Sequence, residues 1–409
     1  MIRNLFYSLR EHLVKKEFTI ITGARQTGKS TLLHELEKYC KKKDIPTIFL
    51  NLENSSILKA LDESPLNIFY YLPITEKRNV IFIDEIQYLN NPSNFLKLLY
   101  DDYAPKIKIV ASGSSAFYMD KSFKDSLAGR KRIFHLPTCD FEEYLNLSSK
   151  LDLLQEITRI RENKNAKSLK IIQLEQEYKQ FLIYGGYPAV ITEKKLTEKK
   201  ELLAEIRDSF VKKDILESDI RNEKEFYNLF RILASQSGNL LNINNLSNTL
   251  DIKNETIKKY LLVLQKCFHI ALVSPFHRNL QKELIKMPKV YLLDSGLMNS
   301  LLNNFQPISE RINKGEIWET ACYKMLSEKY KQDEIYFWRT ISGNEVDFVL
   351  PNIENPFAAE IKFDKNAIKE NKYKKFSENY IDIPLKYIYF QPFTEDFFRM
   401  LLCSGKNIG

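Results

Sequence analysis

The stretch Phe18-Thr-Ile-Ile-Thr-Gly-Ala-Arg-Gln-Thr-Gly28-Lys-Ser-Thr31 decides the fold of the N-terminal part of the chain. Its first five residues are apolar or β-branched, which is typical of a buried parallel strand. Residues 23–30 then match the pattern G-x4-G-K-S/T, a glycine-rich loop between a strand and a helix. The glycines permit a tight turn, and the helix N-terminus favours an anion. The stretch therefore predicts a loop that binds nucleotide phosphates.

We assign the loop and the start of the helix to the nucleotide: Gly23, Ala24, Arg25, Gln26, Thr27, Gly28, Lys29, Ser30 and Thr31. Lys29 is expected to reach the β- and γ-phosphates, and the Ser30 hydroxyl to ligate Mg²⁺. The alternative is a chance match. The small number of glycines, 12 in 409 residues, and the flanking strand and helix patterns disfavour it.

A second apolar run ends in two carboxylates. Residues 80–84 read VIFID, and Glu85 follows Asp84 directly. We expect Asp84 to hold the Mg²⁺ shell and Glu85 to polarise the attacking water. The alternative is a surface carboxylate pair after a core strand. The phosphate-binding loop upstream makes this alternative less favoured.

Two further residues complete the predicted catalytic set. Ser112 ends the apolar run KIVAS, where it could orient water or sense the γ-phosphate; the alternative is a simple turn after a strand. Arg130, in LAGRKR, could supply positive charge to the transition state of its own or a neighbouring subunit. A solvated surface arginine is the alternative.

Composition limits the class of protein. A chain of 409 residues suggests two to three domains at about 150 residues each. The net charge of +8 permits a polyanion partner without requiring one. Five scattered cysteines without a CxxC pair fit a reducing compartment. Because we find no signal peptide and no apolar run of about 18 residues, we expect a cytoplasmic protein without membrane contact.

Strand-like and helix-like runs alternate through the first third of the chain, which predicts a mainly parallel α/β sheet. The strand-like runs are 18–22, 47–51, 80–84, 108–112 and 132–136. Helical periodicity dominates from residue 142 to residue 268, and an α/β pattern returns after Pro307. We therefore predict a multidomain α/β protein.

The middle of the chain shows the order of a helix-turn-helix with a wing. Helical runs at 226–238, 244–250 and 255–268 precede a predicted hairpin at 270–294. The polar residues expected on the third helix and in the hairpin loop are Lys253, Glu255, Lys258, Lys259, His277, Arg278, Lys282 and Lys286. The lysines and arginine suit contacts with DNA phosphates. A packing or regulatory module that touches no DNA is the alternative.

The C-terminal part holds a set of carboxylates. Glu319 lies in a helical segment, and Asp347 and Glu360 lie 13 residues apart on what reads as two adjacent strands. Glu360 and Lys362 project from the same face of one strand because they are two residues apart. Asp347 and Glu360 could jointly hold Mg²⁺, and Lys362 could stabilise the activated water.

These segments together resemble the AAA-type P-loop ATPases of bacteria and archaea, in the branch with a C-terminal winged helix and a restriction-endonuclease-like, PD-(D/E)xK domain. The similar segments are GARQTGKST, VIFIDEIQ, ASGSSA, LAGRKR, LPTCDFEEYL, YGGYPAV and VKKDI. The resemblance implies an ATPase domain at 1–145, a helical lid at 146–222, a winged helix at 223–304 and a restriction-endonuclease-like domain at 305–409. In the last domain Asp347, Glu360 and Lys362 match the nuclease motif and Glu319 matches its helical acid, whereas Val346 replaces the usual proline.

The expected function is therefore hydrolysis of ATP with Mg²⁺, coupled to a nuclease-like module that interacts with DNA. The alternative is a slow nucleotide-dependent switch or scaffold that contacts a protein partner and carries an inactive nuclease-like fold. The resemblance also allows a homo-oligomer, in which Arg130 would act between subunits.

Overall fold

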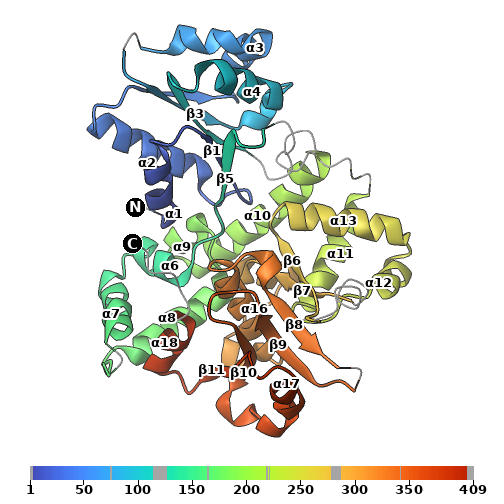
Figure 1. Ribbon diagram of the computed structural model, residues 1–409. Coiled ribbons are helices and arrows are strands. Elements are labelled where there is room, and N and C mark those ends of the chain that lie inside the picture. The colour runs from blue at the N-terminus through green and yellow to red at the C-terminus, as the bar shows by residue number, and fades with distance from the viewer. Residues whose placement is uncertain are drawn as a thin grey trace. The chain divides into compact units, whose positions relative to one another are not determined.

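The computed structural model describes residues 3–73, 76–113, 127–163, 165–217, 220, 222–277, 287–340 and 342–402 (Figure 1). The chain divides into two compact units. The first comprises Met1–Thr138 with Lys266–Phe268, and the second comprises Cys139–Gln265 with His269–Gly409.

The first unit is built on a sheet whose described strands run in the order β2-β3-β4-β1-β5. Every neighbouring pair in it is parallel, so the predicted parallel α/β sheet is confirmed. The helices and strands are α1 (Leu5–His12), β1 (Phe18–Thr22), α2 (Lys29–Lys42), β2 (Thr47–Asn51), α3 (Ser55–Glu63), β3 (Asn79–Asp84), α4 (Pro92–Tyr103), β4 (Ile107–Ser112) and β5 (Lys131–His135).

Both faces of this sheet are covered by helices. Ile20 and Ile109 point to one face, where they join a core cluster with residues of α3 and α4. Ile21 and Val110 point to the other face and join residues of α1 and α2. The side chains alternate because successive residues of a strand project to opposite sides. Burial on both sides explains why the strands read as continuous apolar runs rather than as alternating ones.

The second unit combines helices with two small sheets. The helices of its first part are α6 (Phe141–Leu147), α7 (Leu151–Glu162), α8 (Ile171–Tyr184), α9 (Pro188–Thr192), α10 (Leu196–Glu217), α11 (Glu223–Ser235), α12 (Ile243–Leu250) and α13 (Asn254–Lys266). The remaining elements are β6 (Ile270–Val273), β7 (Lys289–Leu292), α15 (Ser295–Leu302), α16 (Lys314–Ser327), β8 (Tyr336–Arg339), β9 (Glu345–Leu350), β10 (Phe357–Asp364), α17 (Lys374–Asn379), β11 (Leu385–Gln391) and α18 (Glu395–Leu402).

The helices α11, α12 and α13 precede the antiparallel hairpin β6–β7 in the order that the sequence predicts. Both strands lie within the predicted hairpin at 270–294, and residues 278–286 lie outside the described residues. Leu240, between α11 and α12, forms an antiparallel bridge with Lys289 of β7. The strand β7 is therefore held by backbone pairing on both of its sides.

The C-terminal sheet has the order β11-β10-β9-β8. β9 is antiparallel to both β8 and β10, and β10 is parallel to β11. The sequence prediction that Asp347 and Glu360 lie on adjacent strands is confirmed, since β9 and β10 are direct neighbours. On one face Trp338, Val346 and Phe376 belong to a buried apolar cluster, and α16 contacts β10.

The segment Gly185-Gly-Tyr-Pro188 ends α8 and begins α9, and its two glycines lie in close contact with other backbone. The carboxylate of Asp294 caps α15 by accepting the backbone N–H of Leu297 at 3.0 Å, and it also accepts the N–H of Gly186 at 2.8 Å. Gly185 has φ +73°, and a side chain there would collide with Asp294. A Cβ at Gly186 would collide with the backbone of Cys139. Neither position has room for a side chain.

We expect Gly186→Ala to lower the free energy of unfolding by about 2 kcal/mol or more, because the added methyl group must displace backbone atoms. Gly315→Ala is the matched control, since Gly315 lies in α16 with nothing within 4 Å of an added Cβ. That control should be neutral or slightly stabilising. Denaturant unfolding of the two full-length variants checks this prediction, and equal midpoints for both would contradict it.

Candidate functional site

The loop after β1 has the backbone shape that its glycines permit. Gly28 directly precedes α2 and has φ +92°, in the left-handed region that glycine adopts without penalty. Gln26 also lies in that region with φ +60°. At Gly23 a side chain would collide with the carbonyl group of Leu136. The two glycines of the motif are thus required for different reasons, one for its φ angle and one for close approach.

Lys29 is the first residue of α2, and its side chain is buried over the loop. Its ammonium donates hydrogen bonds to the carbonyl oxygens of Gly23 at 3.1 Å and Ala24 at 2.9 Å. The Thr27 hydroxyl also donates to Ala24, and the Arg3 guanidinium donates to the Thr27 carbonyl at 2.8 Å. Because carbonyl groups carry no net charge, a phosphate group is a stronger partner for this ammonium.

The charge of Lys29 affects the protonation of His135, the last residue of β5. Burial first, and then the positive charge of Lys29, lower the pKa of His135 to about 4. The imidazole is therefore neutral at physiological pH and adds no positive charge beside Lys29. Sequence reasoning missed both His135 and Arg3, because nothing in the spacing links either residue to the loop.

The predicted carboxylates and Ser112 lie together. Asp84 and Ser112 are the buried last residues of β3 and β4, and the Ser112 hydroxyl donates to Asp84 Oδ1. The same hydroxyl accepts the backbone N–H of Glu85 at 3.3 Å. Glu85 has φ +58° and ψ +48°, a left-handed conformation that is uncommon outside glycine and concentrates at functional sites. The Gln87 carboxamide donates to the Glu85 carboxylate. Ser112 and Gln87 thus orient the two acids.

Sheet topology explains why these residues meet. β4 lies between β1 and β3, with Ile21 opposite Ser112 in one pair and Ile83 opposite Ala111 in the other. All three strands are parallel, so their carboxyl ends meet at one edge of the sheet, where ligands bind in open α/β folds. The phosphate loop, Ser112 and Asp84 are therefore neighbours although they are 28 to 89 residues apart in sequence.

Arg130 is not part of this edge. Its carbonyl accepts the N–H of Phe18, the first residue of β1, so Arg130 lies at the amino end of the sheet. Its guanidinium donates to both oxygens of Asp101, at 2.6 and 3.1 Å. The structure therefore does not support the expectation that Arg130 serves the nucleotide of its own chain. Action on a neighbouring subunit stays a prediction.

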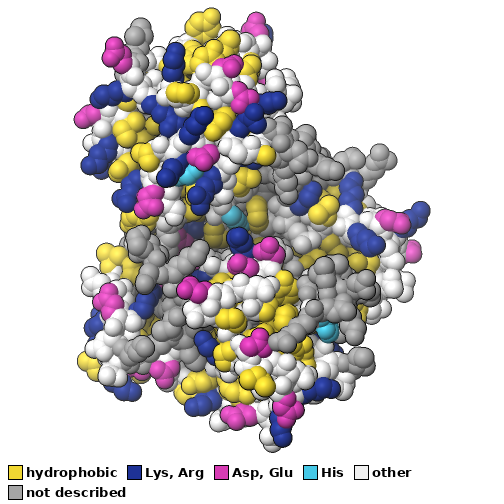
Figure 2. Space-filling view, viewed as in Figure 1, with side chains coloured by type: hydrophobic (Ala, Val, Ile, Leu, Met, Phe, Trp, Pro, Cys, Tyr) yellow, Lys and Arg dark blue, Asp and Glu magenta, His cyan; other side chains and the backbone are white. Residues whose placement is uncertain are grey.

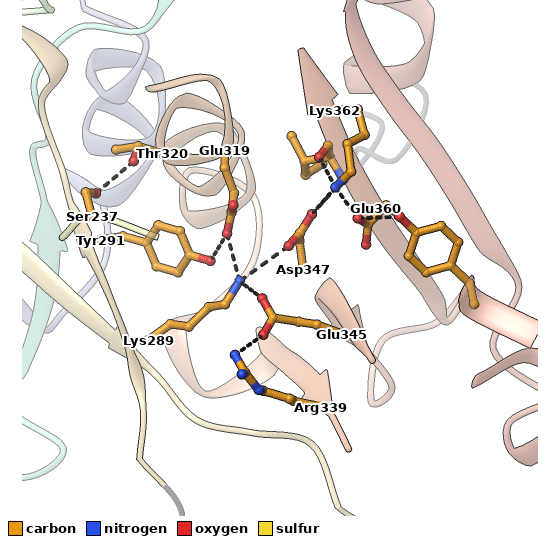
Figure 3. A network of polar contacts seen from close by, with 12 residues as sticks. Ser237, Lys289, Tyr291, Glu319, Thr320, Arg339, Glu345, Asp347, Glu360 and Lys362 are labelled. Carbon is orange, nitrogen blue, oxygen red and sulfur yellow. Dashed lines mark hydrogen bonds and ion pairs between the residues drawn. The ribbon is translucent and has the colours of Figure 1, made fainter. Parts of the chain in front are cut away.

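The second unit contains a buried cluster of charged side chains, which Figure 3 shows. Its centre is Lys289 of β7, whose side chain is only 3% exposed. The Lys289 ammonium lies 2.9 Å from Glu319 of α16, and 2.6 and 3.3 Å from Glu345 and Asp347 of β9. An ammonium has three hydrogens to donate, and each of these carboxylates can accept one.

A second lysine links Asp347 to Glu360, the remaining acid of the predicted nuclease motif. Lys362 hydrogen-bonds the carboxylate of Glu360 and lies 3.9 Å from Asp347 Oδ2. Asp347 Oδ2 also accepts the backbone N–H of Ile361 at 2.8 Å, and the Tyr373 hydroxyl donates to Glu360 Oε1 at 2.8 Å. Glu360 Oε2 is buried and has no hydrogen-bond partner in the described part of the chain.

The edge of the cluster is also hydrogen-bonded. The Tyr291 hydroxyl donates to Glu319 Oε1 at 2.6 Å, and Arg339 donates to Glu345 Oε2 at 2.8 Å. Lys289, Glu345 and Tyr291 are residues that sequence reasoning missed. Glu345 could have been found from its spacing, since it is two residues from Asp347 on one strand and therefore on the same face. Lys289 has no such signal, because it is 58 residues from Asp347.

Burial and mutual repulsion shift the protonation of these groups. Burial raises the pKa of Glu319 and of Glu360, and the charge of Asp347 raises both further. Burial alone would lower the pKa of Lys289, but the surrounding carboxylates outweigh it and hold that pKa well above its ordinary value. The lysine therefore stays charged.

The predicted Mg²⁺ ligands Asp347 and Glu360 are thus close together, but lysines occupy the positions between the acids. Among the residues that the structure describes, no group of three or more His, Cys, Asp or Glu side chains is arranged to hold a metal ion. This arrangement does not fit the metal site that the sequence motif predicts, because Lys289, a residue that the motif does not contain, lies against Glu319 and Asp347 and already supplies positive charge there.

The predicted DNA-facing residues are described only in part. Lys253, Glu255, Lys258 and Lys259, at and before the start of α13, are all exposed, as predicted. Arg278, Lys282 and Lys286 lie outside the described residues. On the face that Figure 2 shows, basic side chains lie among acidic and hydrophobic ones rather than in a continuous band.

Comparison with protein families supports the description of the first unit. Residues 15–145 match the model of an AAA domain. Residues 175–307 match a domain of unknown function (DUF8612), and residues 314–394 match another domain of unknown function (DUF4143). The N-terminal unit is therefore an AAA-type domain with the phosphate loop of nucleotide-binding proteins. No helix in the described ranges has the length and apolar character needed to cross a membrane.

The similar curated proteins are themselves uncharacterized. One from Methanocaldococcus jannaschii is 26% identical over 382 residues, which cover 91% of this chain and 81% of that protein. One from Haemophilus influenzae is 23% identical and covers 95% of this chain and 88% of its own length. Among solved structures, the Aeropyrum pernix Orc1 protein in complex with DNA has 13% identity and a TM-score of 0.31, covering 73% of this chain and 91% of that one. The Thermotoga maritima RuvB Holliday junction branch migration motor has 15% identity and a TM-score of 0.32, covering 65% and 88%. These scores indicate only a loose structural resemblance.

We expect Ser112→Ala to slow ATP hydrolysis by about tenfold while nucleotide affinity changes by less than about twofold, because the lost hydroxyl orients Asp84 and Glu85 rather than the loop. Single-turnover hydrolysis and titration with a fluorescent ATP analogue measure the two effects. Ser112→Thr keeps a hydroxyl and is the matched control. Equal losses of affinity and turnover in Ser112→Ala would contradict the orienting role.

Proposed function

We propose that this chain is a Mg²⁺-dependent ATPase, in which the N-terminal AAA-type domain hydrolyses ATP and the nucleotide state controls the C-terminal region. One observation carries the proposal: the phosphate loop, Asp84, Glu85 and Ser112 gather at the carboxyl edge of β1, β4 and β3. A structural role alone would not require two buried polar residues at the ends of neighbouring strands next to a glycine loop.

Each residue has a role that follows from its place. The loop N–H groups and the start of α2 bind the phosphates, and Lys29 exchanges its carbonyl partners for phosphate oxygens. Glu85 polarises the attacking water, and its position is fixed by the bonds from its backbone to Ser112 and from Gln87 to its carboxylate.

The side chains at this edge also fit Mg²⁺. Ser30, in the first turn of α2, and Asp84, at the end of β3, supply the oxygen atoms that this ion prefers. They would hold the ion with the nucleotide, where it would neutralise charge on the phosphates.

For the C-terminal region we propose a winged helix at 223–304 and a restriction-endonuclease-like fold at 305–409. The order of α11, α12, α13 and the β6–β7 hairpin supports the winged helix. The mixed sheet with α16 beside β10 supports the nuclease-like fold. The exposed lysines of α13 support DNA as a partner. The ion-paired acids favour the version in which this fold is catalytically inactive, as in the switch or scaffold alternative.

Lys29→Ala should reduce ATP hydrolysis by about 100-fold or more and also weaken ATP binding. The reason is that the ammonium contacts the phosphates both in bound ATP and in the transition state of hydrolysis. Glu85→Gln should reduce hydrolysis by about 100-fold with ATP binding retained, because only the activation of water is lost. Phosphate release and equilibrium ATP binding measure these effects. Lys42→Ala, at the exposed far end of α2, is the control and should behave as wild type. ATP turnover that survives in Lys29→Ala would overturn the site.

The double variant Lys258→Glu/Lys259→Glu should weaken binding to duplex DNA by about tenfold and reduce its salt dependence, because phosphate contacts release counterions. Lys194→Glu/Lys195→Glu makes the same change in charge at exposed residues outside α13 and should bind as wild type. Fluorescence anisotropy at several salt concentrations checks this prediction. Equal weakening by both pairs would indicate nonspecific attraction, and no binding by wild type would favour a protein partner.

A further inference from the structure

The Lys289 ammonium lies at the meeting point of three carboxylates in this cluster. It touches one oxygen from each of Glu319, Glu345 and Asp347, which come from α16 and β9. In a carboxylate site for a divalent cation, the ion lies at such a meeting point of oxygens. The ammonium that lies between these oxygens belongs to a residue of a third element, β7. Figure 3 shows Lys289 entering between these carboxylates.

The charges of the cluster are almost balanced without any ligand. Four acids, Glu319, Glu345, Asp347 and Glu360, meet three basic side chains, Lys289, Lys362 and Arg339. A divalent ion added to this set would change its net charge from −1 to +1, around Lys289, Asp347 and Glu360 whose side chains are buried. Buried charges that lack an opposite partner are strongly unfavourable, so such an ion gains little while Lys289 is in place.

We propose that Lys289 is the built-in cation of this cluster, that it excludes divalent metal from the nuclease-like site, and that removing its ammonium creates a metal site from Glu319, Glu345 and Asp347. This inference does not rest on ATP hydrolysis, because every residue in it belongs to the second unit. It makes the C-terminal fold an ion-paired scaffold rather than a metal-dependent nuclease.

The backbone around Lys289 prevents easy withdrawal of the side chain. Lys289 pairs with Val273 across the hairpin and with Leu240 on the other side of β7. Next to it, the Gly238 N–H donates to the Val290 carbonyl at 2.7 Å, and the Leu241 N–H donates to the Pro288 carbonyl at 2.8 Å. A metal ion would have to displace a lysine whose backbone is fixed on both sides. A tethered cation of this kind also loses little entropy on pairing, whereas a free ion must give up its hydration shell.

The decisive variant is Lys289→Met. Methionine keeps the length and apolar character of the lysine stem but lacks the ammonium, so the space between the three acids becomes available. We expect nucleotide-free Lys289→Met to bind one Mn²⁺ per chain with a Kd of about 10⁻⁴ M or tighter. Wild type should show no binding that depends on Asp347. Electron paramagnetic resonance of free Mn²⁺ measures the stoichiometry. Tb³⁺ luminescence excited through tyrosine locates the ion, because Tyr291 hydrogen-bonds Glu319.

Two controls separate this site from the nucleotide site. Lys289→Arg keeps a cation and should bind no Mn²⁺, and Lys289→Met/Asp347→Asn should lose the binding gained by Lys289→Met. Thermal unfolding with and without Mn²⁺ gives a second measurement, in which the ion should stabilise Lys289→Met but not wild type. Thermal unfolding can also detect metal binding by a variant that folds only when Mn²⁺ is added.

Two results would contradict the proposal. Mn²⁺ bound by wild type and lost in Asp347→Asn would overturn it, as would a Lys289→Met chain that Mn²⁺ neither binds nor stabilises. ATP turnover is measured separately on the same preparations. Failure of the ATPase assignment would appear in wild type and would leave these metal titrations unchanged.

Discussion

The position of β4 between β1 and β3 determines the chemistry of the first unit. If β3 paired directly with β1, the Asp84 carboxylate would lie beside the phosphate loop and Ser112 would lie elsewhere. With β4 in between, the Ser112 hydroxyl fills the space and bridges Asp84 and the backbone of Glu85. The parallel direction of the strands brings these groups to one edge, and burial on both faces keeps the strands in register. The site thus depends on sheet order as much as on the loop itself.

The left-handed conformation of Glu85 is a consequence of this arrangement. Asp84 must end its strand pointing into the site, and the chain must then turn sharply before the short helix that begins at Ile86. A non-glycine residue with φ +58° carries a penalty of about 1 kcal/mol or more. The hydrogen bond from its N–H to Ser112 offsets part of this penalty. Glycine would turn here without strain but would not supply a carboxylate.

The sequence predicts much of this architecture because its signals are local. The apolar runs, the spacing of Gly23 and Gly28, and the acid after residues 80–83 each depend on a short segment, and the structure has strands and turns in those places. The two-residue spacing of Glu360 and Lys362 is likewise local, and the two side chains do meet. Arg130 shows where local patterns fail to predict position. Its motif is local, but the sheet places the residue at the opposite edge from the phosphate loop. The contacts of Lys289 and of Asp294 link distant elements, so no pattern of residues along the chain predicts them.

Lys29 and Lys289 show that a buried lysine can serve opposite purposes. Lys29 donates to the carbonyls of Gly23 and Ala24, neutral groups that a phosphate can replace at a gain in free energy. Lys289 donates to carboxylates, so an arriving anion offers it no better partner, and an arriving cation must compete with its charge. The contacts of Lys29 with neutral carbonyls therefore leave the loop able to bind a phosphate ligand. The contacts of Lys289 with carboxylates offset negative charge in its cluster without a ligand. In this chain a nucleotide can therefore change the electrostatics of the first unit, while the charged cluster of the second unit carries its own counter-ion in Lys289.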